Sequence, residues 1–291
     1  MQIIHLPGNY LIKSNIYNPN TKYNTEGFLL TYVLDNKKLL FKEYYNDTKS
    51  VIDNKIYTVE CLNKYNELRK INELIIPEYF IFLEGQFKGI MMNFIPGTNL
   101  ENILYNSSYT IREKLNYLKR LGIILDQIDK LNKSININFR IGDLHEGNII
   151  IDKNDEIKIV DLDSCKICNN FSSYSKYLSS LVNVWMDNKK YKLSEKGIGR
   201  TIDQNRNTDM YCYNIMILNT LYQGNVATLD IDCFYNYLNY LEHIGFDKEL
   251  LYKLSKLYTK QDNENIYEYL DTISKNGYKA HRNIYKIKVS K

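Results

Sequence analysis

The sequence predicts an α+β fold, in which strands are concentrated in the N-terminal third and helices in the remainder. All four prolines lie in that first third, at positions 7, 19, 77 and 96. Because a proline inside a helix removes a backbone hydrogen bond and clashes with the preceding turn, the proline-free chain after residue 96 is free to form long uninterrupted helices. Runs of aromatic and aliphatic residues precede this point, and apolar residues at helical spacing follow it.

A strand pair is predicted near the N-terminus. Residues 27–33 and 38–45 are rich in aromatic and aliphatic side chains, as strands with a buried face are. They flank Asp35-Asn36, two residue types that favour the backbone conformation of a tight turn. The two runs therefore predict a β-hairpin.

One helix and a second hairpin complete the N-terminal third. Apolar residues recur at helical spacing from 58 to 74 and predict a helix with one buried face. Pro77 ends this pattern, because proline cannot continue a helix. Residues 79–83 and 87–94 then predict two strands joined by a short turn.

The remaining two thirds are predicted to be helical apart from one small hairpin. Thr110 and Glu113 form a capping-box pattern, and an apolar stripe continues this helix to Leu131. Two short apolar runs, 148–151 and 157–160, flank a polar turn and predict the hairpin. Further helices are predicted at 209–221, 232–243, 247–258 and 265–273.

Composition narrows the class of protein. Hydrophobic residues make up 44% and charged residues 25%, as in ordinary globular domains. The net charge of +4 is too small to argue for a nucleic acid or membrane partner, and the first ten residues lack the pattern of a secretory signal. Five scattered cysteines predict reduced thiols in a cytoplasmic protein. Cys165 and Cys168 form a lone C-x-x-C pair, without the second pair or the histidines of a zinc site.

Three polar residues around the small hairpin predict a metal site. Asp143 and Asn148 lie in the loop before the hairpin, and Asp161 follows its second strand. The two carboxylates and the amide are therefore expected to converge at one edge. Oxygen ligands of this kind suit Mg²⁺, which binds through a few carboxylates together with substrate phosphates.

These residues resemble the motifs of the protein kinase-like superfamily, in which D-x-x-x-x-N is followed, after a hairpin, by an aspartate of the D-F-G type. The resemblance implies one bilobal catalytic domain, with a small β-rich N-lobe over 1–95 that holds one main helix. The larger, mainly helical C-lobe would cover 96–291. The resemblance also implies ATP and Mg²⁺ as cofactors, with Asp143 orienting the acceptor hydroxyl and Asn148 and Asp161 holding the metal.

The resemblance also assigns phosphate-binding residues in the N-lobe. Lys42, in an apolar strand, would contact the ATP phosphates and pair with a helix glutamate. Glu60 is preferred for this pairing, and Glu67, two helical turns later, is the alternative. Gly27 stands alone where the family has a glycine-rich loop over the phosphates.

A short segment at the end of the second hairpin resembles the hinge that joins the two lobes and binds adenine. Its backbone at about 93–95 would bind the base, and a methionine would line the rear of the pocket. For Met91 and Met92, simple core packing is the alternative role. The residues assigned in this way are Met92, Asn93, Phe94 and Ile95.

Three features relate to different branches of this superfamily. His145, two residues after Asp143, is similar to the catalytic loop of aminoglycoside and choline phosphotransferases, and it could donate to the transferring phosphoryl group. Asp163 replaces the glycine of D-F-G, which again is similar to the small-molecule kinases. Asp209 resembles the aspartate that anchors the catalytic loop of protein kinases through backbone hydrogen bonds.

The favoured function is a Ser/Thr protein kinase that phosphorylates a protein hydroxyl. The alternative enzyme is a small-molecule kinase, which His145 and Asp163 support. A third reading is a nucleotide-binding pseudokinase that acts as a binding module, supported by the single glycine and by the absence of an A-P-E motif before Asp209. The intact Lys42 and Asp143 oppose this third reading.

Overall fold

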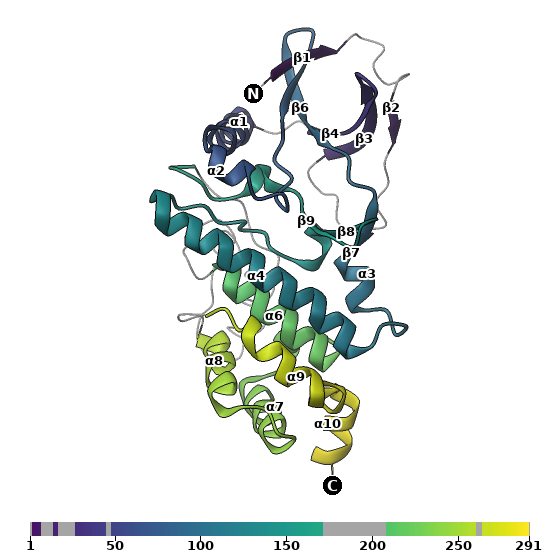
Figure 1. Ribbon diagram of the computed structural model, residues 1–291, viewed down its shortest axis with the longest axis vertical. Coiled ribbons are helices and arrows are strands. Elements are labelled where there is room, and N and C mark those ends of the chain that lie inside the picture. Colours follow the sequence, from purple (N-terminus) through teal and green to yellow (C-terminus); the bar gives the residue numbers. More distant parts are fainter. Residues whose placement is uncertain are drawn as a thin grey trace. The chain divides into compact units, whose positions relative to one another are not determined.

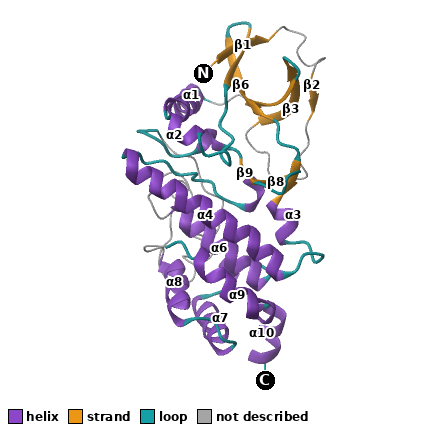
Figure 2. Cartoon of the chain, in the orientation of Figure 1, coloured by secondary structure: helices purple, strands orange, loops and turns teal. Residues whose placement is uncertain are grey.

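The computed structural model describes residues 2–6, 14–16, 27–44, 48–170, 208–259 and 264–290. The chain divides into two compact units (Figure 1), of which the first comprises Met1–Thr98 and Ile150–Phe171 and the second Asn99–Ile149 and Ser172–Lys291. Strands dominate the first unit and helices the second (Figure 2), which confirms the predicted α+β class. No helix within the described ranges has the length and apolar character needed to cross a membrane.

A six-stranded sheet forms most of the first unit. Its order is β1-β5-β6-β4-β3-β2, with β1 parallel to β5 and the other neighbours antiparallel. Both predicted hairpins are present, and Asp35 and Asn36 have left-handed φ angles of 48° and 60°, as a tight hairpin turn requires. The strands are β1 (Gln2–Leu6), β2 (Ser14–Ile16), β3 (Gly27–Leu34), β4 (Lys37–Tyr44), β5 (Tyr79–Leu83) and β6 (Gln86–Asn93).

The two faces of the sheet are distinguished by alternation along β4. Leu39 and Phe41 pack with one apolar cluster, whereas Leu40 and Tyr44 pack with another that contains Val59 of helix α1 (Lys49–Lys64). Because successive side chains of a strand point to opposite faces, Lys42 lies on the same face as Leu40 and Tyr44. Lys42 therefore faces the side of the sheet that packs against α1.

The prediction of a helix over 58–74 starts more than half a helix too late and continues too far. Helix α1 starts at Lys49, and an extended residue, Tyr65, separates it from the short helix α2 (Asn66–Arg69). The first half of α1 was missed because the only fully buried residue before Thr58 is a lysine, Lys55, which breaks the apolar pattern.

A second, three-stranded sheet has the order β7-β8-β9, with β7 (Gly97–Asn99), β8 (Ile149–Asp152) and β9 (Ile157–Ile159). The hairpin of β8 and β9 was predicted, and its turn is closed by Asp152 Oδ1, which accepts from the backbone N–H of Asn154 and Glu156 at 2.8 and 2.9 Å. The backbone N–H of Ile75 donates to the carbonyl of Ile159 at 2.9 Å and ties β9 to the segment after α2.

The second unit is built around helix α4. The predicted capping box is present, since Thr110 Oγ1 accepts from the Glu113 N–H at 3.2 Å and Glu113 Oε2 accepts from the Thr110 N–H at 2.7 Å. Helix α6 is buried almost all round, and its Tyr213 hydroxyl donates to the Leu118 carbonyl of α4 at 2.9 Å. The helices are α3 (Leu100–Leu104), α4 (Ile111–Ile135), α6 (Thr208–Tyr222), α7 (Ile231–His243), α8 (Lys248–Thr259), α9 (Leu270–Asn276) and α10 (Arg282–Val289).

Candidate functional site

Two lysines and two aspartates meet on the face of the six-stranded sheet that packs against α1. Lys42 Nζ lies 2.5 Å from Asp161 Oδ1, and 3.2 and 3.1 Å from Oδ1 and Oδ2 of Asp163. Lys55 Nζ lies 3.4 Å from Asp163 Oδ2, and the Tyr44 hydroxyl donates to the same oxygen at 2.6 Å. We call Lys42, Lys55, Asp161 and Asp163 the lysine–aspartate cluster; all four belong to the first unit.

Each member of the cluster is placed by local structure. Lys42 faces inward by strand alternation, and Lys55 lies on the buried stripe of α1, about one turn before Val59. Asp161 has a left-handed φ of 65°, a conformation that aspartate tolerates better than most residues. This turn leads into the 3-10 turn η3 (Leu162–Ser164), which buries Asp163 completely.

The pKa values of the two carboxylates in the cluster are shifted in opposite directions. Loss of solvation, reinforced by the neighbouring Asp163 charge, raises the pKa of Asp161 to about 6 against the attraction of Lys42. Burial alone would also raise the pKa of Asp163, but Lys42, Lys55 and the Tyr44 hydroxyl outweigh it and hold that pKa well below its usual value. Asp163 is therefore a permanent anion, whereas Asp161 exchanges its proton near neutral pH.

The predicted pairing of Lys42 with Glu60 does not match this geometry. Glu60 is exposed on α1, and Glu67 is half-buried on α2. The Lys42 ammonium group instead meets the carboxylates of Asp161 and Asp163. The reason is the register of α1, which turns Lys55 rather than a glutamate toward the sheet.

Gly27 is the first residue of β3 and pairs with Tyr44 of β4. A Cβ atom at this position would lie 2.0 Å from the Glu43 carbonyl oxygen, so close packing of the two strands requires glycine here. The preceding residues, where a phosphate-covering loop would lie, are outside the described part of the chain.

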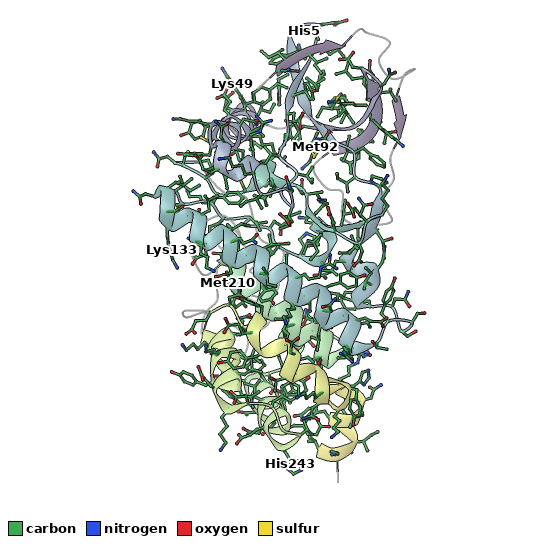
Figure 3. The ribbon with its side chains drawn as sticks, in the orientation of Figure 1. His5, Lys49, Met92, Lys133, Met210 and His243 are labelled. Atoms are coloured by element: carbon green, nitrogen blue, oxygen red, sulfur yellow. The ribbon has the colours of Figure 1, made fainter. Side chains whose placement is uncertain are left out.

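The predicted hinge residues follow one another at the end of β6 and just beyond it. Met92 is buried against the apolar cluster that contains Val59 (Figure 3), so its core-packing role is real. Asn93 Nδ2 donates to Glu78 Oε1 at 2.9 Å, and the Phe94 N–H donates to the Lys38 carbonyl at 3.3 Å. The Phe94 N–H is thus engaged by the Lys38 carbonyl, and Ile95 packs partly buried on the same cluster.

A second polar group lies in the loop between α4 and β8, within the second unit. His145 Nδ1 accepts from the Gly147 N–H at 3.0 Å, which requires a lone pair on Nδ1 and assigns the ring proton to Nε2. His145 Nε2 lies 3.6 Å from Asp143 Oδ2. Asn148 Nδ2 donates to the Asp143 carbonyl at 3.1 Å, so its amide oxygen is the atom that could ligate a cation. We call Asp143, His145 and Asn148 the loop group.

Asp209 fixes the backbone that leads into the loop group. Its Oδ2 and Oδ1 accept from the N–H groups of Ile141 and Gly142, both at 2.9 Å. Gly142 has a φ of 82°, which only glycine adopts readily. The predicted anchoring role of Asp209 is confirmed, and burial raises its pKa in spite of the two backbone donors.

The donor set suits a hard divalent cation. Asp161 offers a carboxylate oxygen and Asn148 an amide oxygen, both ligand types that Mg²⁺ accepts. Within the described ranges no three His, Cys, Asp or Glu side chains gather as a ready-made metal cluster. Mg²⁺ usually binds through one or two protein ligands with substrate phosphates and waters, so a protein needs to offer it few donors.

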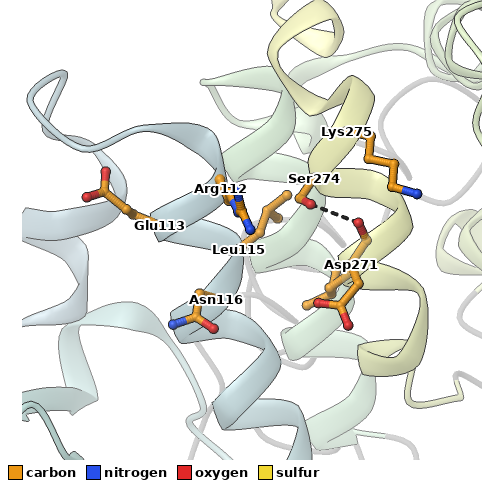
Figure 4. Close-up of a pocket in the computed structure, with 8 residues that line it drawn as sticks. Arg112, Glu113, Leu115, Asn116, Asp271, Ser274 and Lys275 are labelled. Atoms are coloured by element: carbon orange, nitrogen blue, oxygen red, sulfur yellow. Dashed lines mark hydrogen bonds between the residues drawn. The ribbon is translucent and has the colours of Figure 1, made fainter.

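A pocket of about 680 Å³ lies in the second unit between the beginning of α4 and α9 (Figure 4). Its lining includes Arg112, Glu113, Asp271 and Lys275, and Ser274 Oγ donates to the Asp271 carbonyl at 2.8 Å. The acidic and basic groups balance, and none of the predicted site residues lines it. This pocket is therefore separate from the candidate site.

Two contacts of the lysine–aspartate cluster were missed in the sequence, that of Lys42 with Asp163 and that of Lys55 with Asp163. Asp163 was noted only as a departure from D-F-G, and its spacing of two from Asp161 was the available signal. Lys55 gave no signal, because a lysine within a polar stretch is most often exposed. Tyr44, which donates to Asp163, gave no signal either, because it is one of 27 tyrosines in the chain.

The chain has a weak and partial similarity to a protein kinase. Over 122 residues it is 27% identical to the dual specificity protein kinase zakA of Dictyostelium discoideum. This stretch makes up 42% of the present chain and 15% of that protein. No protein-family model matches the chain.

Proposed function

We propose that the chain is an ATP- and Mg²⁺-dependent phosphotransferase with a bilobal protein kinase-like fold, and that it transfers the γ-phosphate to a Ser or Thr hydroxyl of a protein. The observation that carries this proposal is the 2.5 Å contact between Lys42 of β4 and Asp161. These are the two residues that the sequence resemblance assigns to phosphate and metal binding. The partial similarity to a protein kinase points the same way.

Each unit holds part of the proposed machinery. In the first unit, Lys42 would bind the nucleotide phosphates and Asp161 a metal ion. In the second unit, Asp143 would accept or orient the proton of the acceptor hydroxyl, and Asn148 would supply an amide oxygen to the metal. His145, with its proton on Nε2, would donate to the transferring phosphoryl group. Catalysis would then rest on positioning and charge stabilisation.

Mg²⁺ would neutralise the developing charge on the phosphate oxygens during transfer. Its protein ligands would be Asn148 and Asp161, whose oxygen donors suit this ion. The raised pKa of Asp161, about 6, leaves its carboxylate ionised at neutral pH and therefore able to ligate a cation.

A protein acceptor is favoured because the partial relative is a protein kinase. A small-molecule acceptor is the second candidate, and two observations favour it. His145 is held by the Gly147 N–H beside Asp143, and Asp163 is an integral, buried member of the lysine–aspartate cluster. Both residues belong to the motifs that resemble aminoglycoside and choline phosphotransferases.

The test is transfer of labelled phosphate from ATP in the presence of Mg²⁺. The acceptors are a generic basic protein, a small set of aminoglycosides, and choline. Asp143→Asn removes the proposed base, and Asp232→Asn, an exposed aspartate of α7, serves as the matched control. Label on protein in the wild type and the control, lost in Asp143→Asn, supports the protein kinase proposal.

Other outcomes redirect the assignment. Label on an aminoglycoside or on choline, again dependent on Asp143, would replace the protein acceptor with a small molecule. ATP binding measured by calorimetry, with no transfer to any acceptor, would contradict the enzyme proposal and favour a nucleotide-binding pseudokinase. Transfer that survives in Asp143→Asn would remove Asp143 from its proposed role.

A further inference from the structure

The Asp163 carboxylate is enclosed by donors from two different elements. From β4, Lys42 Nζ lies 3.1 Å and the Tyr44 hydroxyl 2.6 Å from Oδ2. From α1, Lys55 Nζ lies 3.4 Å from the same oxygen, and its ammonium group also lies 4.4 Å from the centre of the Tyr44 ring. The Asp163 side chain is 0% exposed, so these donors replace water as its solvation.

Asp161 differs from Asp163 in its access to solvent. Its side chain is 35% exposed, while it reaches the same Lys42 ammonium group at 2.5 Å. The exposed carboxylate of Asp161 can exchange Lys42 for another cation at little cost, because water solvates it. The buried carboxylate of Asp163 cannot, because it would be left in the interior without its counter-charge. Asp163 is therefore the permanent partner of Lys42, and Asp161 the exchangeable one.

Helix α1 contributes a positive charge to this cluster. Lys55 is buried at 5% exposure, whereas Glu60 of the same helix is exposed. Two lysines and two aspartates balance within the cluster. The carboxylate that holds Lys42 is thus Asp163, from the segment after β9, and helix α1 contacts the same carboxylate through Lys55.

We propose that Asp163 is the positioning residue that holds Lys42 for phosphate binding, and that Lys55, acting through Asp163, couples helix α1 to that lysine. The inference rests on the proposed function, because it is that function which assigns Lys42 to bind a phosphate. In this arrangement Asp161 turns from Lys42 toward a metal ion, while Asp163 retains the lysine in place.

The role of Asp163 is tested on the nucleotide-free chain by trace acetylation with acetic anhydride, quantified for each lysine by mass spectrometry. In Asp163→Asn we expect Lys42 to react about tenfold faster, because loss of the buried carboxylate releases its ammonium group from the cluster and opens it to the reagent more often. Asp53→Asn, at an exposed position of the same helix, is the matched control and leaves the rate unchanged. Where Asp163→Asn does not fold, Tyr44→Phe removes only the 2.6 Å hydrogen bond and gives a smaller increase.

The same variants separate positioning from a merely structural role in steady-state kinetics. Asp163→Asn should raise the KM for ATP by about tenfold and lower kcat by less, because the loss falls on binding of the phosphates by Lys42. Asp53→Asn should leave both constants unchanged.

The role of Lys55 is tested by hydrogen exchange of the α1 amides. Lys55→Met should speed exchange along α1 by about tenfold, as expected when a packed element loses a buried tie. Lys55→Arg retains the charge and should restore slow exchange. Lys42 acetylation should also rise in Lys55→Met, by less than in Asp163→Asn, because Asp163 loses one of the two lysines that hold it in place.

The outcomes distinguish this inference from the proposed function. Wild-type acetylation of Lys42 in a folded Asp163→Asn variant would overturn the role of Asp163. Wild-type exchange of α1 in Lys55→Met would overturn the coupling. Both measurements need no nucleotide, so a chain that transfers no phosphate but shows the expected rates would refute the proposed function and support the positioning of Lys42.

Discussion

Lys42 Nζ lies 2.5 Å from Asp161 Oδ1, although 119 residues separate the two along the chain. A strand lysine and an aspartate that follows a distant hairpin thus form one ion pair within the first unit. If both bind a nucleotide complex as proposed, this ion pair is the resting arrangement that the phosphates and the metal replace. The energetics of the site then depend on how readily Lys42 and Asp161 separate.

Lys42→Met should lower kcat/KM for ATP by at least about 100-fold, the usual loss when one preorganised charge at a transferring group is removed. Lys37→Met, at the exposed beginning of the same strand, is the control and should behave as the wild type. The measurement is steady-state phosphate transfer over a range of ATP concentrations. An unchanged kcat/KM in Lys42→Met would exclude this lysine from phosphate binding.

The two aspartates of the cluster should change the pH dependence of stability in opposite directions. The pKa of Asp161 is raised from its usual 3.8 to about 6. The stabilisation that Asp161 adds to the free energy of unfolding is therefore present below about pH 4 and is lost as pH rises to about 6. The pKa of Asp163 is lowered, so its contribution is present above about pH 4 and is lost as pH falls further.

These signs can be separated by urea unfolding of the metal-free chain between about pH 3 and pH 7. Asp161→Asn should remove a decrease in the free energy of unfolding between about pH 4 and pH 6. Asp163→Asn should remove a loss on the acid side of about pH 4. Parallel profiles for the wild type and both variants would contradict the opposite shifts.

Asp209→Asn should destabilise the second unit by about 1.5–3 kcal/mol, because a charged carboxylate that accepts two backbone N–H groups is replaced by an amide with one acceptor. Phosphate transfer should fall as well, since the bonded residues Ile141 and Gly142 lead into Asp143. Chemical unfolding measures the first effect and the transfer assay the second. The exposed Asp155→Asn serves as control, and equal stability of the two variants would refute the anchoring role.

Gly122→Ala should destabilise α4, although alanine is the better helix former by about 1 kcal/mol. A Cβ atom at Gly122 would lie 2.4 Å from the Tyr213 hydroxyl oxygen and 2.5 Å from Tyr267 Cβ. Overpacking of this kind costs about 1–3 kcal/mol and should reverse the sign of the propensity effect. The measurement is the Tm of Gly122→Ala in thermal unfolding, compared with that of Ile123→Ala at the next and more exposed position. A Tm for Gly122→Ala above that of the wild type would contradict this prediction and show that Tyr213 can move to accommodate the added methyl group.

Local sequence signals predicted the elements that depend on local physics. The turn at Asp35-Asn36 and the capping box of Thr110 and Glu113 each use a few neighbouring residues, and both are present. The two N-terminal strands β1 and β2 were not predicted. Strand β1 pairs with β5 across more than 70 residues, and no short pattern encodes such a partner.

The candidate site was predictable only where a residue type and its spacing coincide with a motif. Asp143, Asn148, Asp161 and Lys42 were found in this way, and Asp209 was assigned the contact that it makes. The pairing of Lys42 with Asp163 was not predictable, because no local pattern joins a strand lysine to a carboxylate 121 residues away. Lys55 lies on the buried face of α1, and only tertiary packing reveals it.

The first unit is made of two stretches of chain, Met1–Thr98 and Ile150–Phe171, and this discontinuity dictates an order of events during synthesis. Lys42 and Lys55 leave the ribosome 121 and 108 residues ahead of Asp163, so a nascent chain holds both lysines before their shared carboxylate exists. Helix α4, with its local cap, can form in that interval. The unit that begins first in translation is therefore completed only after the whole of α4 and the loop that follows it have been made.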